Sequence, residues 1–173
     1  SDNPRPAPTS GSYQKIDPKI STEDGRGINA DLTGYRLFDT NGNPANMDEM
    51  ISKVKSADVT FIGEIHTDTI AHNLEAMLLE RTWDKWQTLS LEMFETDVQY
   101  VLDEYMTGHI NEEHFLKSAR SWENYGSDYR KLIEFSKEKG TSVIAANAPR
   151  RYVNMVRRMG KNSLLNLPEE GKR

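Results

Sequence analysis

The sequence predicts an α/β fold in three layers, a mainly parallel sheet flanked by helices. Two observations carry this prediction: short β-branched apolar runs recur along the chain, and helical apolar patterns separate them. A strand, a helix and a further strand in succession favour a right-handed crossover, which makes the two strands parallel. The 173 residues suit one ordinary domain.

The expected strands are short, and polar residues follow most of them. They cover residues 35–38, 58–62, 88–91 and 142–146. Helices are expected over 47–54, from a cap at Thr67 or Asp68 to 81, from a capping box at Thr96 to 106, from Asn111, from Ser127 or Asp128 to Gly140, and over 150–159. Three clear strands and a short one are few for a complete domain, so we expect an incomplete one.

The chain divides into a polar arm and a domain. Residues 1–30 hold four of the seven prolines and almost no apolar periodicity, which predicts a flexible arm. Residues 31–173 are expected to form the α/β domain, truncated at its C-terminal side. No run of apolar residues is long enough to cross a membrane.

Composition excludes several classes of protein. Without cysteine the chain has no disulfide, Fe–S cluster, thiolate zinc site or cysteine nucleophile. A formal charge of −5 argues against binding of nucleic acid. The Gly-rich phosphate loop and G-x-S-x-G are absent, which disfavours kinases, dinucleotide-binding dehydrogenases and α/β-hydrolases.

Charge is unevenly spread along the chain. Residues 86–116 carry seven acidic side chains and no basic one, whereas residues 146–173 carry seven basic side chains against two acidic ones. These regions could pair with each other, or the basic end could meet an anionic ligand.

Candidate functional residues follow the expected strands. Glu64 and His66 come after the strand over 58–62, Glu92 after that over 88–91, and Asn147 and the arginines after that over 142–146. Because ligands bind beyond the carboxyl ends of parallel strands, these groups are expected to converge at one edge.

Glu64, His66, His72 and Glu92 are the residues that a divalent metal or acid–base catalysis would use. The spacing differs from the compact H-E-x-x-H arrangement. On spacing alone we favour a structural interpretation, in which Glu64 caps the following helix and His72 packs on it.

The arginine pair and the aromatic residues each have two interpretations. Arg150 and Arg151 begin a helix, where they suit an anion, and pairing with the acidic region is equally consistent. Tyr125 and Tyr129 lie near Trp122 and could contact a flat ligand, since tyrosine can ligate ferric haem. Aromatics at this spacing more often form helix core.

An ordered set of segments resembles the ChaN-like family of iron-regulated, haem-binding bacterial lipoproteins with an α/β fold. The set comprises Val59–His66, His72, Leu91–Phe94, the Trp122, Tyr125 and Tyr129 group, and Ala145–Arg150. The resemblance implies haem as ligand and a location at the bacterial cell envelope. It also implies that the arm follows a lipidated cysteine absent from this chain, which would be the only membrane attachment.

The G-E-x-H segment is shared more widely. It is similar to segments of erythromycin-esterase-like proteins and of Tiki-type metalloproteases, and this similarity implicates Glu64, His66, His72 and Glu92 in catalysis or metal binding. The second G-x-x-H segment expected of the proteases is not found in this sequence.

Two functions follow as hypotheses. The first is a membrane-tethered haem-binding lipoprotein of iron acquisition, a binding protein rather than an enzyme. Tyr125 or Tyr129 would ligate iron, Arg150 and Arg151 would pair with propionates, and His66, His72 and Asn147 would complete the pocket. Because haem has two faces, a homodimer is expected. The second is a Glu/His-dependent or metal-dependent hydrolase using Glu64, His66 and Glu92.

Overall fold

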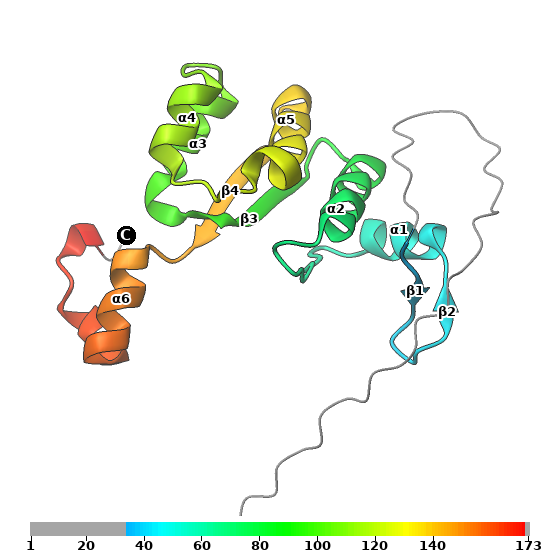
Figure 1. Cartoon of the computed structure of the whole chain (residues 1–173), viewed down its shortest axis with the longest axis horizontal. Coiled ribbons are helices and arrows are strands. Elements are labelled where there is room, and N and C mark those ends of the chain that lie inside the picture. Colours follow the sequence, from blue (N-terminus) through cyan, green and yellow to red (C-terminus); the bar gives the residue numbers. More distant parts are fainter. Residues whose placement is uncertain (1–33, 172–173) are drawn as a thin grey trace, which may run out of the picture.

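A two-stranded parallel sheet forms the centre of the protein in the computed structural model, which describes residues 34–171 (Figure 1). Strands β3 (Thr88–Glu95) and β4 (Ser142–Asn147) pair in register as far as Leu91 and Ala145. The register then shifts, and Glu95 lies opposite Asn147. The predicted α/β class and parallel pairing are confirmed, and β3 runs four residues further than predicted.

The connection from β3 to β4 is helical and covers one face of the sheet. It contains η1 (Thr96–Val98), α3 (Gln99–Met106), α4 (Glu112–Ala119), η2 (Tyr125–Tyr129) and α5 (Arg130–Lys139). Buried and exposed residues alternate along β4 and along β3 as far as Met93, as expected when only one face is covered, and the last three residues of β3 are all buried. Glu92 and Ile144 lie on the other face of the sheet and are exposed in the described structure. The predicted layer of helices on that face therefore stays a prediction.

The core lies between the covered face and these helices. Its fully buried aromatic side chains are Phe94 of β3 and Phe115 of α4, whose rings are 5.5 Å apart. Tyr105 of α3 stacks on Phe115 at 4.4 Å. Burial of these rings fixes α3 and α4 against the sheet.

The N-terminal elements lie away from the parallel sheet, with α1 (Met47–Ser56) packed on α2 (Thr69–Thr82) (Figure 1). Strands β1 (Leu37–Phe38) and β2 (Pro44–Ala45) form a small antiparallel hairpin that leads into α1. Gly42 has φ +83°, so the predicted turn at Asn41-Gly42 needs the conformational freedom of glycine. The arm predicted over residues 1–30 lies outside the described residues.

The predicted strand over residues 58–62 is not formed. A strand is held by hydrogen bonds to a neighbouring strand, and this segment pairs with none of the described strands. Its apolar side chains are exposed as a result, with Val59 at 66% and Phe61 at 93%. The apolar pattern predicts a segment suited to a sheet but does not supply its partner.

Two predicted helix caps are confirmed and one is wrong. Asp68 accepts hydrogen bonds from two backbone N–H groups and starts α2 (Thr69–Thr82), and Asn111 starts α4 in the same way. The capping box at Thr96 does not form, and η1 precedes α3 instead. The reason is that the Gln99 side chain bonds the backbone of β4, at 2.9 and 2.7 Å, and does not reach back.

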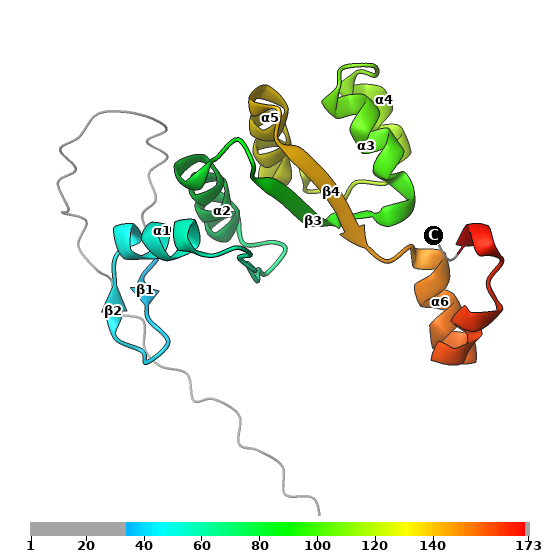
Figure 2. The same ribbon diagram turned by 180° about the vertical axis from the view of Figure 1, so that it is seen from behind.

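Helix α6 (Arg150–Met159) stands apart from the sheet with η3 (Lys161–Asn166) and η4 (Glu169–Gly171) packed beside it (Figures 1 and 2). No residue of α6 is fully buried. None of the helices within residues 34–171 is both long and apolar enough to cross a membrane.

Candidate functional site

Glu64 lies at the centre of a cluster of polar side chains between the loop before α2 and η2. Its Oε1 accepts hydrogen bonds from His66 Nδ1, at 2.8 Å, and from the Tyr129 hydroxyl. Its Oε2 lies 3.0 Å from His72 Nδ1. Glu64, His66, His72 and Tyr129 were all predicted from the sequence, and the fold brings them together. Glu64 does not cap α2, a role that Asp68 takes.

His72 is completely buried, and both of its ring nitrogens face acceptors. Nδ1 lies 3.0 Å from carboxylate oxygens of Glu64 and Glu75, and Nε2 lies 3.1 Å from the carbonyl oxygen of His66. Both nitrogens can donate at once only in the imidazolium. Burial opposes this charge, but the carbonyl and the carboxylates outweigh it and raise the pKa of His72.

Glu75 completes the cluster and was missed in the sequence. It lies three residues after His72, hence on the same face of α2, and its side chain is 11% exposed. Burial and a hydrogen bond to Glu64 raise the pKa of Glu75 to about 7. The spacing of three residues between His72 and Glu75 was the sequence signal that could have identified Glu75.

The pKa values of Glu64 and Tyr129 are shifted in opposite directions. Burial opposes the charge of Glu64, but hydrogen bonds from Glu75, Tyr129 and His66 outweigh it and lower its pKa. Burial and the neighbouring carboxylate raise the pKa of Tyr129 well above its usual range. Glu64 is therefore the ionised carboxylate and Tyr129 a neutral hydrogen-bond donor.

The donor atoms of Glu64, His72 and Glu75 lie within 4.8 Å of one another, a spacing that suits a metal ion. Oxygen and imidazole nitrogen ligands of this kind are typical of zinc and other divalent first-row metals. A metal would have to displace protons from His72 and Glu75, so its affinity would rise with pH.

His66 is the member of the site that reaches solvent. Its side chain is 51% exposed, and its ring lies 4.5 Å from that of Trp122. With Nδ1 donating to Glu64, the lone pair is on Nε2, which is the arrangement that second-shell carboxylates give to metal-ligating histidines. The Asn124 amide donates to the His66 carbonyl at 2.7 Å and holds the loop in place.

A second cluster lies where β3 ends and α6 begins. Glu95 is buried, accepts the backbone N–H of Arg150 at 3.0 Å, and pairs with the guanidiniums of Arg150 and Arg120 at 3.1 Å each. Asp97 pairs with Arg120 and Arg151. Burial opposes the charge of Asp97, but these arginines outweigh it and lower its pKa. Of the two interpretations of the arginine pair, pairing with the acidic region is present.

The segment from Arg120 to Asn124 connects the two clusters. Arg120 belongs to the Glu95 cluster, Trp122 contacts His66, and Asn124 bonds the His66 backbone. The predicted convergence of these groups at one sheet edge is therefore wrong in part, because the strand over 58–62 is not formed and the groups lie in two clusters that this segment joins. Sequence reasoning missed Arg120, whose φ of +53° ends α4 in a left-handed turn that favours glycine.

Three other predicted residues lie outside the Glu64 cluster. Tyr125 is in the core, where its ring lies 5.9 Å from Phe115. Glu92 is within β3 on the exposed face of the sheet, because the strand continues past the predicted end. Asn147 is half-buried at the end of β4, opposite Glu95.

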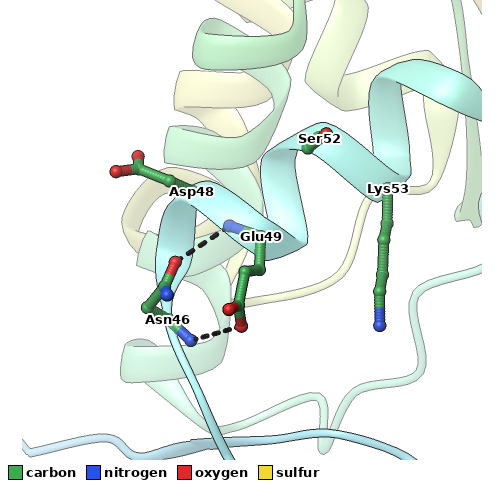
Figure 3. Close-up of a pocket in the computed structure, with 5 residues that line it drawn as sticks. All are labelled: Asn46, Asp48, Glu49, Ser52 and Lys53. Atoms are coloured by element: carbon green, nitrogen blue, oxygen red, sulfur yellow. Dashed lines mark hydrogen bonds between the residues drawn. The ribbon is translucent and has the colours of Figure 1, made fainter.

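An open hollow of about 550 Å³ lies on α1, away from these clusters (Figure 3). It is lined by Asn46, Asp48, Glu49, Ser52 and Lys53. Asn46 and Glu49 are engaged in the capping box that begins α1. The hollow contains none of the histidine, tyrosine or arginine candidates, so the site is assigned to the Glu64 cluster.

Comparisons with known proteins give the family of the chain. No curated protein and no solved structure matches the chain. Residues 50–173 match the family model described as haem-binding uptake, Tiki superfamily, ChaN, and this span includes every residue of both clusters. The chain therefore belongs to this haem-binding uptake family, ChaN, of the Tiki superfamily.

Proposed function

We propose that the protein binds haem and serves iron acquisition as an iron-regulated lipoprotein tethered at the bacterial cell envelope. The family description supports haem as the ligand. The observation that carries the proposal is His66, a half-exposed imidazole whose Nδ1 is bonded to the partly buried carboxylate of Glu64.

The residues around His66 fit a haem group. Its Nε2 is free to ligate iron, and Trp122 lies against its ring. Ile62 and Ile65 flank Glu64 in the sequence and are 52% and 72% exposed, so their aliphatic side chains are available to pack against a porphyrin. When bound, haem supplies the iron and an apolar surface, while the chain supplies the ligand and its orientation.

Tyr129 and Tyr125, the predicted iron ligands, are less available than His66. Ferric iron takes the phenolate, and the pKa of each tyrosine is raised, by burial first and then by nearby carboxylates and, at Tyr125, the Tyr105 phenol. Tyr129 already donates to Glu64, so it would have to leave that bond. We therefore place His66 first and Tyr129 second as iron ligand.

Arg150 and Arg151 remain candidates for the propionates. Their side chains are 72% and 54% exposed, although each already pairs with one carboxylate. A guanidinium has five N–H donors and can serve a second anion at the same time. A propionate would thus share these arginines with Glu95 and Asp97.

Titration with haemin, followed in the Soret region, tests the proposal. The parent chain is expected to show a saturable shift, which His66→Ala weakens strongly and His114→Ala, at another exposed histidine, leaves unchanged. Tyr129→Phe and Tyr125→Phe test the tyrosines beside it. A rise without saturation in the parent would overturn the proposal. Size-exclusion chromatography with and without haemin tests the proposed homodimer.

A metal-dependent hydrolase is the second candidate, favoured by the grouping of Glu64, His72 and Glu75. A bound metal would lower the pKa of a water molecule, and these residues would hold the metal. Zinc or manganese content after dialysis at pH 8 is expected to fall in Glu75→Gln and to remain in His66→Ala. Equal metal content in the parent and Glu75→Gln would contradict this function, whatever the haemin result.

A further inference from the structure

Asp128 of η2 is a buried acidic side chain that neither proposed function uses. It is 4% exposed, its Oδ2 accepts a hydrogen bond from Asn124 Nδ2 at 2.9 Å, and its Oδ1 has no hydrogen-bond partner in the described structure. Lys131 interacts with it electrostatically, but the Lys131 ammonium donates to the Asn73 side chain. Because burial of a carboxylate costs free energy unless the group is well paired, stability alone does not explain Asp128.

The backbone of η2 brings Asp128 to the candidate site. The helix predicted to begin at Ser127 or Asp128 begins at Arg130 instead, without a side-chain cap. Before it the chain winds as a π-helix, in which the Arg130 N–H bonds the carbonyl of Tyr125. Such turns are rare and often occur at functional sites. Asn124 directly precedes η2, and its side chain reaches the loop that carries His66.

Asn124 uses both hydrogens of its side-chain amide. Nδ2 donates to the His66 carbonyl at 2.7 Å and to Asp128 Oδ2 at 2.9 Å. An amide carries two donor hydrogens on its nitrogen and only acceptor capacity on its oxygen. If this amide turned over, its oxygen would face two acceptor oxygens. The carboxylate of Asp128 therefore fixes the direction of the Asn124 amide, and the amide holds the His66 backbone.

The direction of the His66 ring depends on hydrogen bonds, since the side chain is 51% exposed. Nδ1 of the ring bonds Glu64, and the carbonyl of the same residue accepts from His72 Nε2 at 3.1 Å and from Asn124. The carbonyl is thus held from α2 on one side and from η2 on the other. Loss of the bond from η2 leaves the loop attached through α2 and Glu64 alone.

We propose that Asp128 is a positioning residue for His66, which acts by orienting the Asn124 amide that holds the His66 carbonyl. The chain of contacts from Asp128 through Asn124 to the loop sets where Nε2 of the imidazole faces the ligand. The inference rests on the proposed function, in which His66 ligates the iron of haem. The positioning itself exists in the haem-free protein and is tested there first.

Backbone ¹⁵N relaxation of the full chain without haem measures the order of the loop. The amides of residues 64–67 are expected to have order parameters of about 0.85 in the parent and to fall toward about 0.6 in Asp128→Ala and in Asn124→Ala. Asp128→Ala/Asn124→Ala should be no lower than Asn124→Ala, because Asp128 acts through Asn124. Asp128→Asn keeps a side-chain carbonyl that can accept from Asn124, so it should restore the order that Asp128→Ala loses.

Haemin titration of the same variants measures the consequence for the ligand. Loss of a residue that orients a metal ligand is expected to raise the dissociation constant of haemin about tenfold in Asp128→Ala, in Asn124→Ala and in the double variant alike. Asp103→Ala is the matched control. Asp103 accepts from the Gln99 amide at 2.9 Å over the same spacing of four residues, but that amide bonds β4. Both measurements should therefore stay at the parent value in Asp103→Ala.

Several outcomes would overturn the role of Asp128. They are an ordered loop in Asn124→Ala, a loss of order in Asn124→Ala without one in Asp128→Ala, losses that add in the double variant, and unchanged haemin affinity in a variant whose loop is loosened. If Asp128→Ala does not fold, the first outcome still decides, because the less buried Asn124 carries the contact to the loop. Haemin binding without saturation in the parent would overturn the proposed function, while the order parameters still decide whether Asp128 positions His66.

Discussion

A single carboxylate, Glu64, determines the arrangement of the candidate site. Four side chains contact it, those of His66, His72, Glu75 and Tyr129, and His72 also bonds the backbone of His66. The exposed His66 is thus held through both its ring and its carbonyl. This arrangement orients a potential ligand without an exposed charge at the ligand itself, which suits the capture of an apolar cofactor.

Two tyrosines of η2 are expected to differ in their contribution to stability. Tyr129 donates to the Glu64 carboxylate, whereas the buried Tyr125 hydroxyl has no hydrogen-bond partner in the described structure. Tyr129→Phe should therefore lower the free energy of unfolding by about 2 kcal/mol, and Tyr125→Phe should leave it unchanged or raise it slightly. Urea denaturation measures both. Equal losses would contradict the assigned hydrogen bonds.

Glu75 is expected to make the protein less stable as pH rises. In the unfolded chain it loses its proton near 4.5, whereas the folded protein keeps it up to about 7. Between these values the folded state binds more protons, so the free energy of unfolding falls with increasing pH. The raised pKa of His72 likewise makes the free energy of unfolding fall with increasing pH, from about pH 6.5 upward. Glu64, whose pKa is lowered, acts only below 4.5 and in the opposite direction.

Denaturation midpoints between pH 4.5 and 8 test this pH dependence. Glu75→Gln keeps a donor toward Glu64 but cannot ionise, so most of the decline between pH 4.5 and 7 should disappear. Glu92→Gln, on the exposed face of the sheet, should retain the decline of the parent. Parallel curves for the parent and Glu75→Gln would show that another group titrates.

At the scale of elements, the fold depends on β3 and not on the apolar segment that precedes the site. Phe94 is fully buried between the sheet and α4, whereas Phe61 is 93% exposed. Phe94→Ala should cost about 3–5 kcal/mol because it leaves a cavity in the core. Phe61→Ala should change stability by less than about 0.5 kcal/mol. Thermal unfolding of both variants measures the difference, and a large loss in Phe61→Ala would show that its segment is packed.

The contrast between local and distant hydrogen bonds shows how far local sequence determines these elements. Asp68 and Asn111 cap helices through contacts within three residues, so their roles could be predicted. Gln99 bonds β4, 44 and 46 residues away, and such a contact leaves no local pattern. The segment over 58–62 has strand-like residues but depends on a distant partner. The candidate site follows this rule in part: Arg120, which contacts Glu95 from 25 residues away, was not predicted, but Glu75 was missed although its contact with His72 is local.

Over the whole molecule, the uneven charge of the sequence holds α6 to the sheet. The acidic region supplies Glu95 and Asp97, and the basic region supplies Arg150 and Arg151. The Asp97 pairs are partly exposed and should be screened by salt, whereas Glu95 is buried and should be screened less. Salt alone is therefore not expected to detach α6, and the buried carboxylate is the group to change.

Glu95→Gln is expected to loosen α6 and to lower the free energy of unfolding by about 2–4 kcal/mol. The substitution leaves the Arg120 and Arg150 guanidiniums without their buried charge and weakens the acceptor of the Arg150 backbone N–H. Amide hydrogen exchange should consequently accelerate at Arg150 and along α6 before the sheet opens. Glu92→Gln changes the same charge on the exposed face of the same strand and should leave both measurements unchanged. If the two variants exchange alike, α6 is held by packing and not by the buried carboxylate.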